Sequence, residues 1–378
     1  MKLTIERAAL LKALGHVQSV VERRNTIPIL SNVLLTAGRE GLALSATDLD
    51  MEIVDEAPAR IEAPGQITAP AHTLYEIVRK LPEGADVSLS FTGEDPRLQV
   101  QAGRYKVNLP VLPGGDFPIM SSDGLSGRVS IDTGEMMRLI DKTRFAISTE
   151  ETRYYLTGIY LHTVVEDGRP LLRAVATDGH RLALADMPAP EGAGGAPGVI
   201  VPRKTIQEAR RLMEDSGETL EIQLSPQKVR FEFGRAALTS KVIDGSFPDY
   251  TRVIPRENHR VMTVDNTLFA AAVDRVATIS SEKSRSVKLA VESGRVVLTV
   301  RNMETGQAVE ELEVDYDGEP FEIGFNARYL MDVTAQIAGE TAEFRFADRS
   351  SSASMLEPVL VLDPTDAGVQ YVLMPLRA

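Results

Sequence analysis

Apolar positions along this chain follow one pattern that occurs six times: a short alternating strand leads into an amphipathic helix. Successive copies are 62, 64, 68, 65 and 59 residues apart. In the first, third and fifth copies the helical stripe residues are spaced by four, three and four positions, which places them on one face. A unit with one exposed apolar face must pack against its neighbours, so six copies predict an arc, a solenoid or a ring. The copies begin at Ile5, Ile67, Ile131, Val199, Val264 and Ile323.

The six copies fall into two alternating families, so the larger repeat is three-fold, with a period of about 125–130 residues. The predicted helices start at residues suited to capping. Asp132 with Glu135 resembles a capping box, and Asp265 or Asn266 can cap the third odd copy. Proline or asparagine precedes the even helices, which suits first-turn geometry. The pattern predicts two helices in each large repeat.

Between the helices, short apolar runs separated by Gly, Asp or Pro turns predict antiparallel strands. The loops repeat too: residues 45–48 (SATD) recur as 175–178 (VATD), and 115–118 (GDFP) recur as 245–248 (GSFP). Each repeat is therefore expected to be an α+β domain of two helices packed on antiparallel sheets, with about eight strands. We expect three such domains, at residues 1–122, 128–254 and 260–378.

Composition and charge narrow the class of protein. The chain has no cysteine, which excludes disulfides and thiolate metal sites. No apolar run approaches ~18 residues and Met1–Leu14 has no signal-peptide pattern, so we expect a cytoplasmic protein without membrane contact. The net charge is −13, yet the six helical segments together carry +6 and the remainder −19. Helices that share one surface could attract phosphates there; alternatively, their Lys and Arg side chains are simply solvated.

Asp178 and His180 are the pair that most resembles a catalytic or metal site. The chain has five histidines, but none has metal-ligand spacing, and there is no GxSxG motif, phosphate-binding loop or cysteine nucleophile. The equivalent loop at Asp48 lacks the histidine, so we expect Asp48 and Asp178 to share a role in the turn. The sequence indicates a protein without enzymatic activity, metal or cofactor.

Several longer motifs resemble those of one family. The chain begins MKLTIER (1–7) and ends with YVLMPLR (371–377). Between these lie RYYLTG (153–158), ATDGHRLA (176–183) and FPDY (247–250). In these motifs, and over essentially its whole length, the chain resembles the bacterial DNA polymerase III beta subunits, the β sliding clamps.

The resemblance implies three repeated DNA-clamp domains that form half of a closed ring, completed head to tail by a second copy in a homodimer. It implies a sliding clamp for DNA replication, which encircles double-stranded DNA and gives the polymerase processivity. Such a ring needs attraction to the DNA phosphate backbone and few contacts with the bases. The implied protein partners are the replicative polymerase alpha subunit, the clamp loader, other polymerases and repair proteins, bound through short peptide motifs. The alternative is a repeat-built peptide-binding scaffold that does not encircle DNA.

The resemblance also implies a peptide-binding site between the middle and last domains. Leucine, valine, methionine and proline can form an apolar cleft, and methionine adapts to varied ligands. For any one apolar residue, core packing is the alternative role. The expected members are Arg153, Tyr155, Leu156, Thr177, Gly179, His180, Arg181, Leu182, Pro248, Arg252, Val253, Ser352, Val372, Met374, Pro375 and Leu376.

DNA contacts are expected in two loops and on the helices. Arg24 matches a family DNA-contact position, and Tyr154 lies near the other contact loop. Glu150 and Glu151 stand just before that loop, where the family usually has an amide, and their carboxylates would repel phosphate. Basic helical residues are candidates by charge alone, with a solvated surface as the alternative role: Lys12, Arg79, Arg138, Arg203, Lys204, Arg210 and Arg211.

The dimer seam is expected to join the first domain of one copy to the third domain of the other. The resemblance implies that strand 104–109 pairs edge to edge with a strand of the third domain, and exposed strand edges favour such pairing. An internal edge covered by a loop is the alternative. The expected seam residues are Arg104, Val107, Leu109, Thr278 and Ile279.

Overall fold

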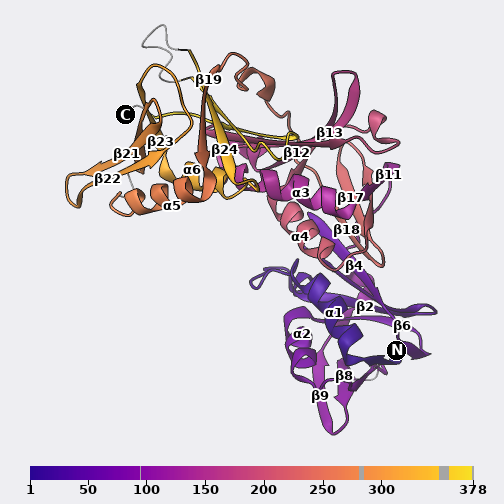
Figure 1. Cartoon of the computed structure of the whole chain (residues 1–378). Coiled ribbons are helices and arrows are strands. Elements are labelled where there is room, and N and C mark those ends of the chain that lie inside the picture. The colour runs from indigo at the N-terminus through magenta and orange to yellow at the C-terminus, as the bar shows by residue number, and fades with distance from the viewer. Residues whose placement is uncertain (94, 281–284, 349–356, 377–378) are drawn as a thin grey trace. The chain divides into compact units, whose positions relative to one another are not determined.

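The structure is a computed structural model, which describes residues 1–93, 95–280, 285–348 and 357–376 (Figure 1). Within the described residues, no helix has both the length and the apolar character needed to cross a membrane.

The chain folds into two compact units. Unit 1 consists of Met1–Met137 and Pro190–Val242. Unit 2 consists of Arg138–Ala189 and Ile243–Ala378. The point of division falls within α3 (Thr133–Thr143), so the middle predicted domain contributes to both units.

Unit 1 contains two antiparallel sheets. In spatial order, the first runs β5 (Arg60–Ala63), β1 (Lys2–Glu6), β7 (Asp86–Ser90), β8 (Arg97–Ala102) and β9 (Tyr105–Pro110). The second runs β10 (Leu112–Pro113), β6 (Gly65–Pro70), β2 (Asn32–Gly38), β3 (Gly41–Thr47), β4 (Met51–Ala57), β18 (Ala236–Lys241), β17 (Lys228–Phe233), β16 (Thr219–Leu224) and β11 (Ser126–Asp132). The pairing of β4 with β18, with Ile53 opposite Leu238, joins strands of two predicted domains into one sheet.

Unit 2 also contains two antiparallel sheets. The larger runs through β12 (Gly158–Glu166), β13 (Arg169–Thr177), β14 (Arg181–Pro188), β26 (Val369–Leu373), β25 (Val359–Leu362), β24 (Thr341–Phe346) and β19 (Arg260–Asp265). The smaller runs β22 (Gly306–Glu313), β21 (Arg295–Asn302), β20 (Ser286–Glu292) and β23 (Phe321–Asn326). The pairing of β14 with β26 corresponds to that of β4 with β18 in unit 1.

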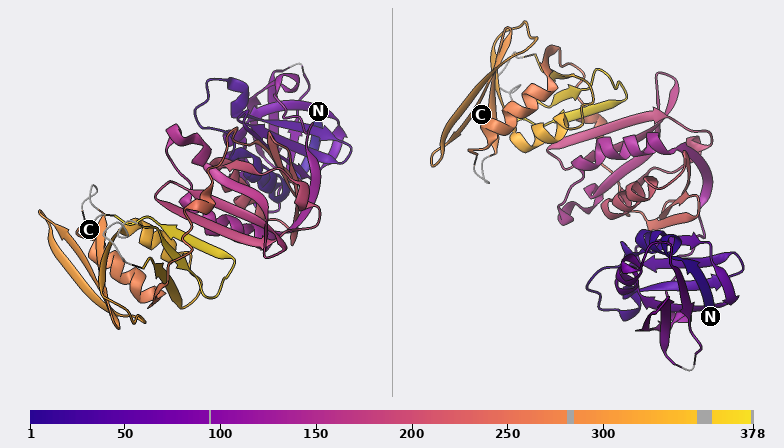
Figure 2. Two further views of the ribbon diagram at one scale, coloured as in Figure 1. Left: turned by 90° about the horizontal axis from the view of Figure 1, so that it is seen from above. Right: turned by 60° about the horizontal axis from the view of Figure 1, so that its bottom comes forward.

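The six predicted helices are confirmed. In unit 1, α1 (Arg7–Gln18) packs against α2 (Ala71–Lys80), and β15 (Val199–Pro202) leads into α4 (Arg203–Met213). In unit 2, α5 (Asn266–Ala277) packs against α6 (Ala327–Thr334), as Figures 1 and 2 show.

The helical apolar faces form the cores, as their spacing predicts. Leu10, Leu14 and Val17 on α1 are fully buried, and so are Phe269 and Val273 at the equivalent positions of α5. Removing such faces from water is the main favourable contribution to folding. Burial of these stripes therefore holds each helix pair against its sheets.

The predicted caps are also present. Asp132 Oδ1 accepts the backbone N–H of Glu135 at 2.9 Å. At α5 the cap is Asp265, which accepts from Leu268 N at 2.8 Å. Asn266, the other candidate, is buried and donates its side-chain amide to the carbonyl of Thr334 at 3.1 Å. The first of the two alternatives is thus correct for this helix.

Candidate functional site

The loop between β13 and β14 is a tight turn built by side-chain oxygens. Asp178 Oδ1 accepts the backbone N–H groups of His180 and Arg181 at 2.9 and 3.0 Å. Asp48 Oδ1 accepts the N–H groups two and three positions after it at 3.0 and 2.8 Å. The predicted turn role of Asp48 and Asp178 is confirmed. This turn holds His180 exposed at the end of the strand pair.

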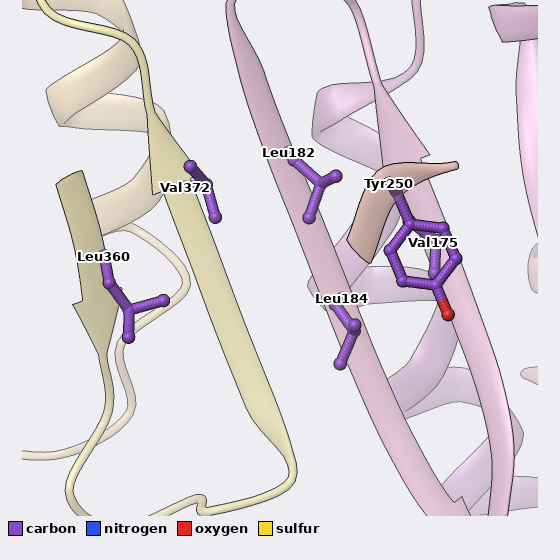
Figure 3. Packing of buried hydrophobic residues seen from close by; sticks show 6 residues of the cluster. All are labelled: Val175, Leu182, Leu184, Tyr250, Leu360 and Val372. Atoms are coloured by element: carbon purple, nitrogen blue, oxygen red, sulfur yellow. The ribbon is translucent and has the colours of Figure 1, made fainter. Parts of the chain in front are cut away.

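Beside the turn, β14 and β26 carry two apolar members of the predicted peptide site, Leu182 and Val372. Leu182 stands opposite Val372, and Val372 stands opposite Leu360 on β25. These three side chains belong to a buried cluster with Val175, Leu184 and Tyr250; Figure 3 shows five of the six on neighbouring strands and Tyr250 on a short helical turn beside them. Where β26 ends, Met374 donates its N–H to the carbonyl of His180 at 2.9 Å. We call His180, Leu182, Leu360, Val372 and Met374 the anchor surface.

Aromatic and charged side chains pack against His180 at the edge of the anchor surface. The His180 ring stacks on Tyr329 of α6, with centroids 6.2 Å apart. The guanidinium of Arg181 lies 4.6 Å from the Tyr329 ring and forms ion pairs with Asp178 and Asp332. Tyr329 is absent from the predicted set, because nothing in the local sequence links a tyrosine on α6 to a turn some 150 residues earlier.

Gly179 and Arg153 lie against each other. Gly179 has φ +86°, and a Cβ at this position would collide with the Arg153 guanidinium. The close approach and the positive φ both favour glycine here. Arg153 also binds Glu150 through Nε at 2.9 Å and Nη2 at 2.8 Å. One of the two carboxylates that precede this loop is therefore paired with a cation.

The other predicted peptide-site residues occupy several elements of unit 2. Val253 and Leu376 are unusual in being apolar yet 42 % and 39 % exposed, and Pro248 and Arg252 are exposed as well. Leu156, Pro375 and Leu182 are buried, while Tyr155, Thr177 and Met374 are half-buried. Leu376 donates its N–H to the carbonyl of Gly324 at 2.8 Å, which anchors the end of the described chain. Ser352 lies outside the described residues.

A largely buried ionic network contacts the cluster through the hydroxyl of Tyr250. Arg173, 8 % exposed, donates to Asp186 from Nε at 2.7 Å and Nη2 at 2.6 Å, and also pairs with Glu166. The Tyr250 hydroxyl lies 3.1 Å from His162 Nε2. Burial and the nearby positive charge of Arg173 lower the pKa of His162 to about 4. His162 is therefore neutral at physiological pH and can act as a hydrogen-bond partner of Tyr250.

The predicted DNA-contact residues differ in whether their side chains already have interaction partners within the chain. Arg24 follows α1 and is exposed, Lys12 and Arg203 are exposed on α1 and α4, and Tyr154 is 53 % exposed. The remainder have internal partners. Arg79 pairs with Glu76, Arg210 with Glu214, Lys204 with Asp48, Arg138 with Asp366, and Arg211 with Glu208 and with carbonyls at the end of α1.

The predicted seam residues lie on β9, just before it (Arg104) and after α5. The strand β9 is the edge strand of its sheet and carries Val107 and the buried Leu109. Thr278 is exposed and Ile279 is half-buried. Beside β9, α2 and Tyr105 line an open hollow of about 630 Å³ whose apolar residues include Ile77, Leu81 and the 45 % exposed Tyr105. The amphipathic stripe of α2 contains Ile77 and Leu81, but their proximity to β9 follows only from the fold.

Comparison with known proteins assigns nearly the whole chain to one protein family. Models of the N-terminal, central and C-terminal domains of the DNA polymerase III beta subunit match residues 1–121, 130–249 and 251–377. The beta sliding clamp of Caulobacter vibrioides is 78% identical over 377 residues, with 100% of each chain covered. That of Escherichia coli K12 is 37% identical over 378 residues, again with 100% of each covered.

Solved structures give the same result. A crystal structure of the Caulobacter crescentus beta sliding clamp, with polyethylene glycol bound to a proposed beta-motif tethering region, has a TM-score of 0.97 and 77% identity, covering 100% of this chain and 99% of that one. The Bartonella birtlesii clamp bound to griselimycin has a TM-score of 0.95 and 46% identity, with 100% of both chains covered. This chain therefore belongs to the family of DNA polymerase III beta subunits, the beta sliding clamps, which are non-catalytic processivity factors of DNA replication.

Proposed function

We propose that two copies of this chain close head to tail into a ring that encircles duplex DNA in the cytoplasm and tethers the replicative polymerase. The proposal rests on full-length membership of the clamp family, together with the concentration of positive charge on the helices. Each copy would contribute the three domains at residues 1–122, 128–254 and 260–378. Retention by topology needs only weak, sequence-independent attraction to phosphates.

The seam of this ring would pair β9 of one copy with β22 of the other. Both are edge strands of their sheets, so each presents backbone groups that a second copy can pair with. Their charges are complementary: Arg104 and Lys106 lie on or just before β9, whereas β22 carries Glu310, Glu311 and Glu313. The hollow beside β9 would receive Ile279 of the second copy. Such head-to-tail contacts are heterologous and avoid open filaments only when the ring closes.

The anchor surface would bind the short peptides of polymerases, clamp loader and repair proteins. Its adaptable Met374 and polar His180, together with the exposed Val253 and Leu376 of the predicted peptide site, provide the mixture of apolar area and orienting groups that peptide sites need. Two or three buried anchors at ~1.5–3 kcal/mol each, less the cost of ordering the peptide, correspond to micromolar affinity.

Deletion of Met374–Ala378 tests the peptide site. Loss of Met374 removes a contact with His180, and loss of Leu376 removes an exposed apolar residue. We expect a labelled peptide copied from the polymerase tail to lose binding while the protein stays dimeric. Unchanged affinity would exclude this assignment of the site.

Topological trapping tests the ring. Clamps loaded onto closed circular duplex should remain bound and should leave once the duplex is cut. Equal release from circular and linear DNA would favour the alternative, a peptide-binding scaffold that does not encircle DNA. The scaffold would still dimerise and bind the peptide, so the two experiments separate the hypotheses.

A further inference from the structure

The strands under the anchor surface have a counterpart in unit 1. In unit 2 the strands run β13, β14, β26, β25, and in unit 1 they run β3, β4, β18, β17. One row of paired positions crosses each set. In unit 2 the row reads Thr177, Leu182, Val372, Leu360. In unit 1 it reads Thr47, Glu52, Thr239, Arg230.

The chemistry of the row is reversed between the units. The three apolar positions that follow threonine in unit 2 are a carboxylate, a hydroxyl and a guanidinium in unit 1. The correspondence continues at the surface, because Lys241 donates its N–H to the carbonyl of Asp50 at 2.9 Å, as Met374 does to His180. Where unit 2 has methionine and histidine, unit 1 has a lysine and an aspartate that form an ion pair at 3.0 Å.

The polar side chains of unit 1 satisfy one another. Glu52 is only 4 % exposed and accepts the hydroxyl of Ser45 at 2.6 Å and the N–H of Met120 at 3.1 Å. Arg230 donates from Nη1 to Thr239 Oγ1 at 2.9 Å. We call Asp50, Glu52, Arg230, Thr239 and Lys241 the counterpart surface.

An apolar anchor placed on the counterpart surface would be unfavourable. Its methyl groups would displace water or protein partners from charged groups and offer no hydrogen bond in return. On the anchor surface the same insertion buries apolar area against the half-buried Met374, and the row behind it holds the apolar Leu182 and Val372, with no charged group to desolvate. The discrimination between the two surfaces thus comes as much from a repulsive element in one as from attraction in the other.

We infer that the counterpart surface is a specificity determinant: its buried Glu52 and Thr239 and its half-buried Arg230, with the Asp50–Lys241 ion pair, exclude the apolar peptides that the anchor surface captures. The inference rests on the proposed peptide site in unit 2. It makes the repeated fold asymmetric in function, so that a partner can dock in unit 2 alone.

The first test carries the apolar row into unit 1. In full-length protein, Glu52→Leu, Thr239→Val and Arg230→Leu are combined, and binding of the polymerase-tail peptide is measured by calorimetry. We expect stoichiometry to rise from one to two peptides per chain, with the added site about tenfold weaker. A folded variant that still binds one peptide per chain overturns the inference. The matched control, Arg128→Leu with Glu221→Leu, removes a polar pair elsewhere on the same sheet and should leave the stoichiometry at one.

The second test carries unit 1 residues into unit 2, and it decides the matter if the apolar variant does not fold. His180→Asp with Met374→Lys changes an exposed and a half-buried side chain, and Val372→Thr is nearly isosteric. Each should lower peptide affinity at least tenfold, because each brings polarity to the anchor surface. Unchanged affinity in the Val372→Thr protein overturns the inference.

The matched control for the second test is Asp50→His with Lys241→Met, which should leave the affinity of unit 2 unchanged. Failure of the inference and failure of the proposed function give different results. If His180→Asp with Met374→Lys binds normally, the peptide site itself is misplaced. If the unaltered protein binds two peptides per chain and the unit 1 substitutions remove one of them, the peptide site stands and the inference fails.

Discussion

His16 Nδ1 lies 2.7 Å from Oδ2 of Asp55, and both side chains are buried in unit 1. The other ring nitrogen, Nε2, lies 3.0 Å from Oδ2 of Asp215, which follows α4. The ring therefore bridges two carboxylates, one from the first and one from the middle predicted domain. Burial lowers the pKa of His16, but the hydrogen bonds to Asp55 and Asp215 outweigh burial, and its pKa is raised.

The raised pKa of His16 predicts stability that depends on pH. Because the folded state holds the proton more tightly than the unfolded state, this contribution is complete below about pH 6.5 and is lost as the pH rises through the folded pKa. His16→Asn should therefore lower the melting temperature more at pH 6 than at pH 8.5, as measured by calorimetry. His72 offers a control, because its ring contacts Gln18 and the carbonyl of Val21 and has no carboxylate hydrogen-bond partner among the described residues. A gap between wild type and His16→Asn that is equal at every pH would contradict the bridge.

The Arg173–Asp186 pair predicts a large loss of stability when it is broken. Substitution of Arg173 by Met leaves the nearly buried Asp186 carboxylate without its main cation, which typically costs about 3–5 kcal/mol. Urea unfolding of Arg173→Met should show this loss in the free energy of unfolding. Arg169, on the same strand but exposed, is the control, and Arg169→Met should change the stability by no more than about 0.5 kcal/mol. Equal effects of the two substitutions would show that the network stabilises nothing.

Ile279 tests the proposed seam. An aspartate at this position would place a charge in the apolar hollow beside β9 of the other copy, which is strongly unfavourable. Light scattering should then show a particle of 41.2 kDa where the unaltered protein gives twice that mass. Leu268→Asp is the control, because Leu268 is also apolar and exposed, at 56 %, but lies at the start of α5. A dimeric Ile279→Asp protein would place the seam elsewhere.

Arg24 tests the proposed DNA contact. Its exposed guanidinium has no ion pair within the described residues, so reversal to Glu should lose one phosphate contact and add repulsion. We expect the affinity for duplex DNA to fall about threefold to tenfold, and the slope of log K against log salt to decrease by about 1. Arg295→Glu provides the control, because Arg295 on β21 is paired with Glu292 on β20 and with Glu311 on β22. If both reversals act equally, only net charge matters.

The local elements were predictable because each depends on neighbours in the chain. The stripe of Leu10 and Leu14, the cap at Asp132 and the turn at Asp178 all involve residues within a few positions of one another. The two alternatives left open at α5 could not be separated in this way. The choice between Asp265 and Asn266 depends on Thr334, which binds the Asn266 amide from another helix.

The candidate site was predictable only as a set of residues. Family motifs nominate Leu182 and Val372, but the strand register alone places them opposite each other. Tyr329 belongs to the site through its stacking on His180, and the counterpart surface is defined by the pairing of strands that places Glu52 opposite Thr239. These relationships join residues more than one hundred positions apart, which no local pattern encodes.

The sequence by itself determined the six-fold repeat, its helices and caps, and the segregation of positive charge, because spacing, propensity and charge are properties of the chain before it folds. Only the tertiary structure decided that His16 bridges Asp55 and Asp215, and that Glu52 occupies the place of Leu182. The physical reason is that burial and strand pairing bring distant groups into a poorly hydrated environment. There the partner of each polar atom, and not its residue type, determines its energy.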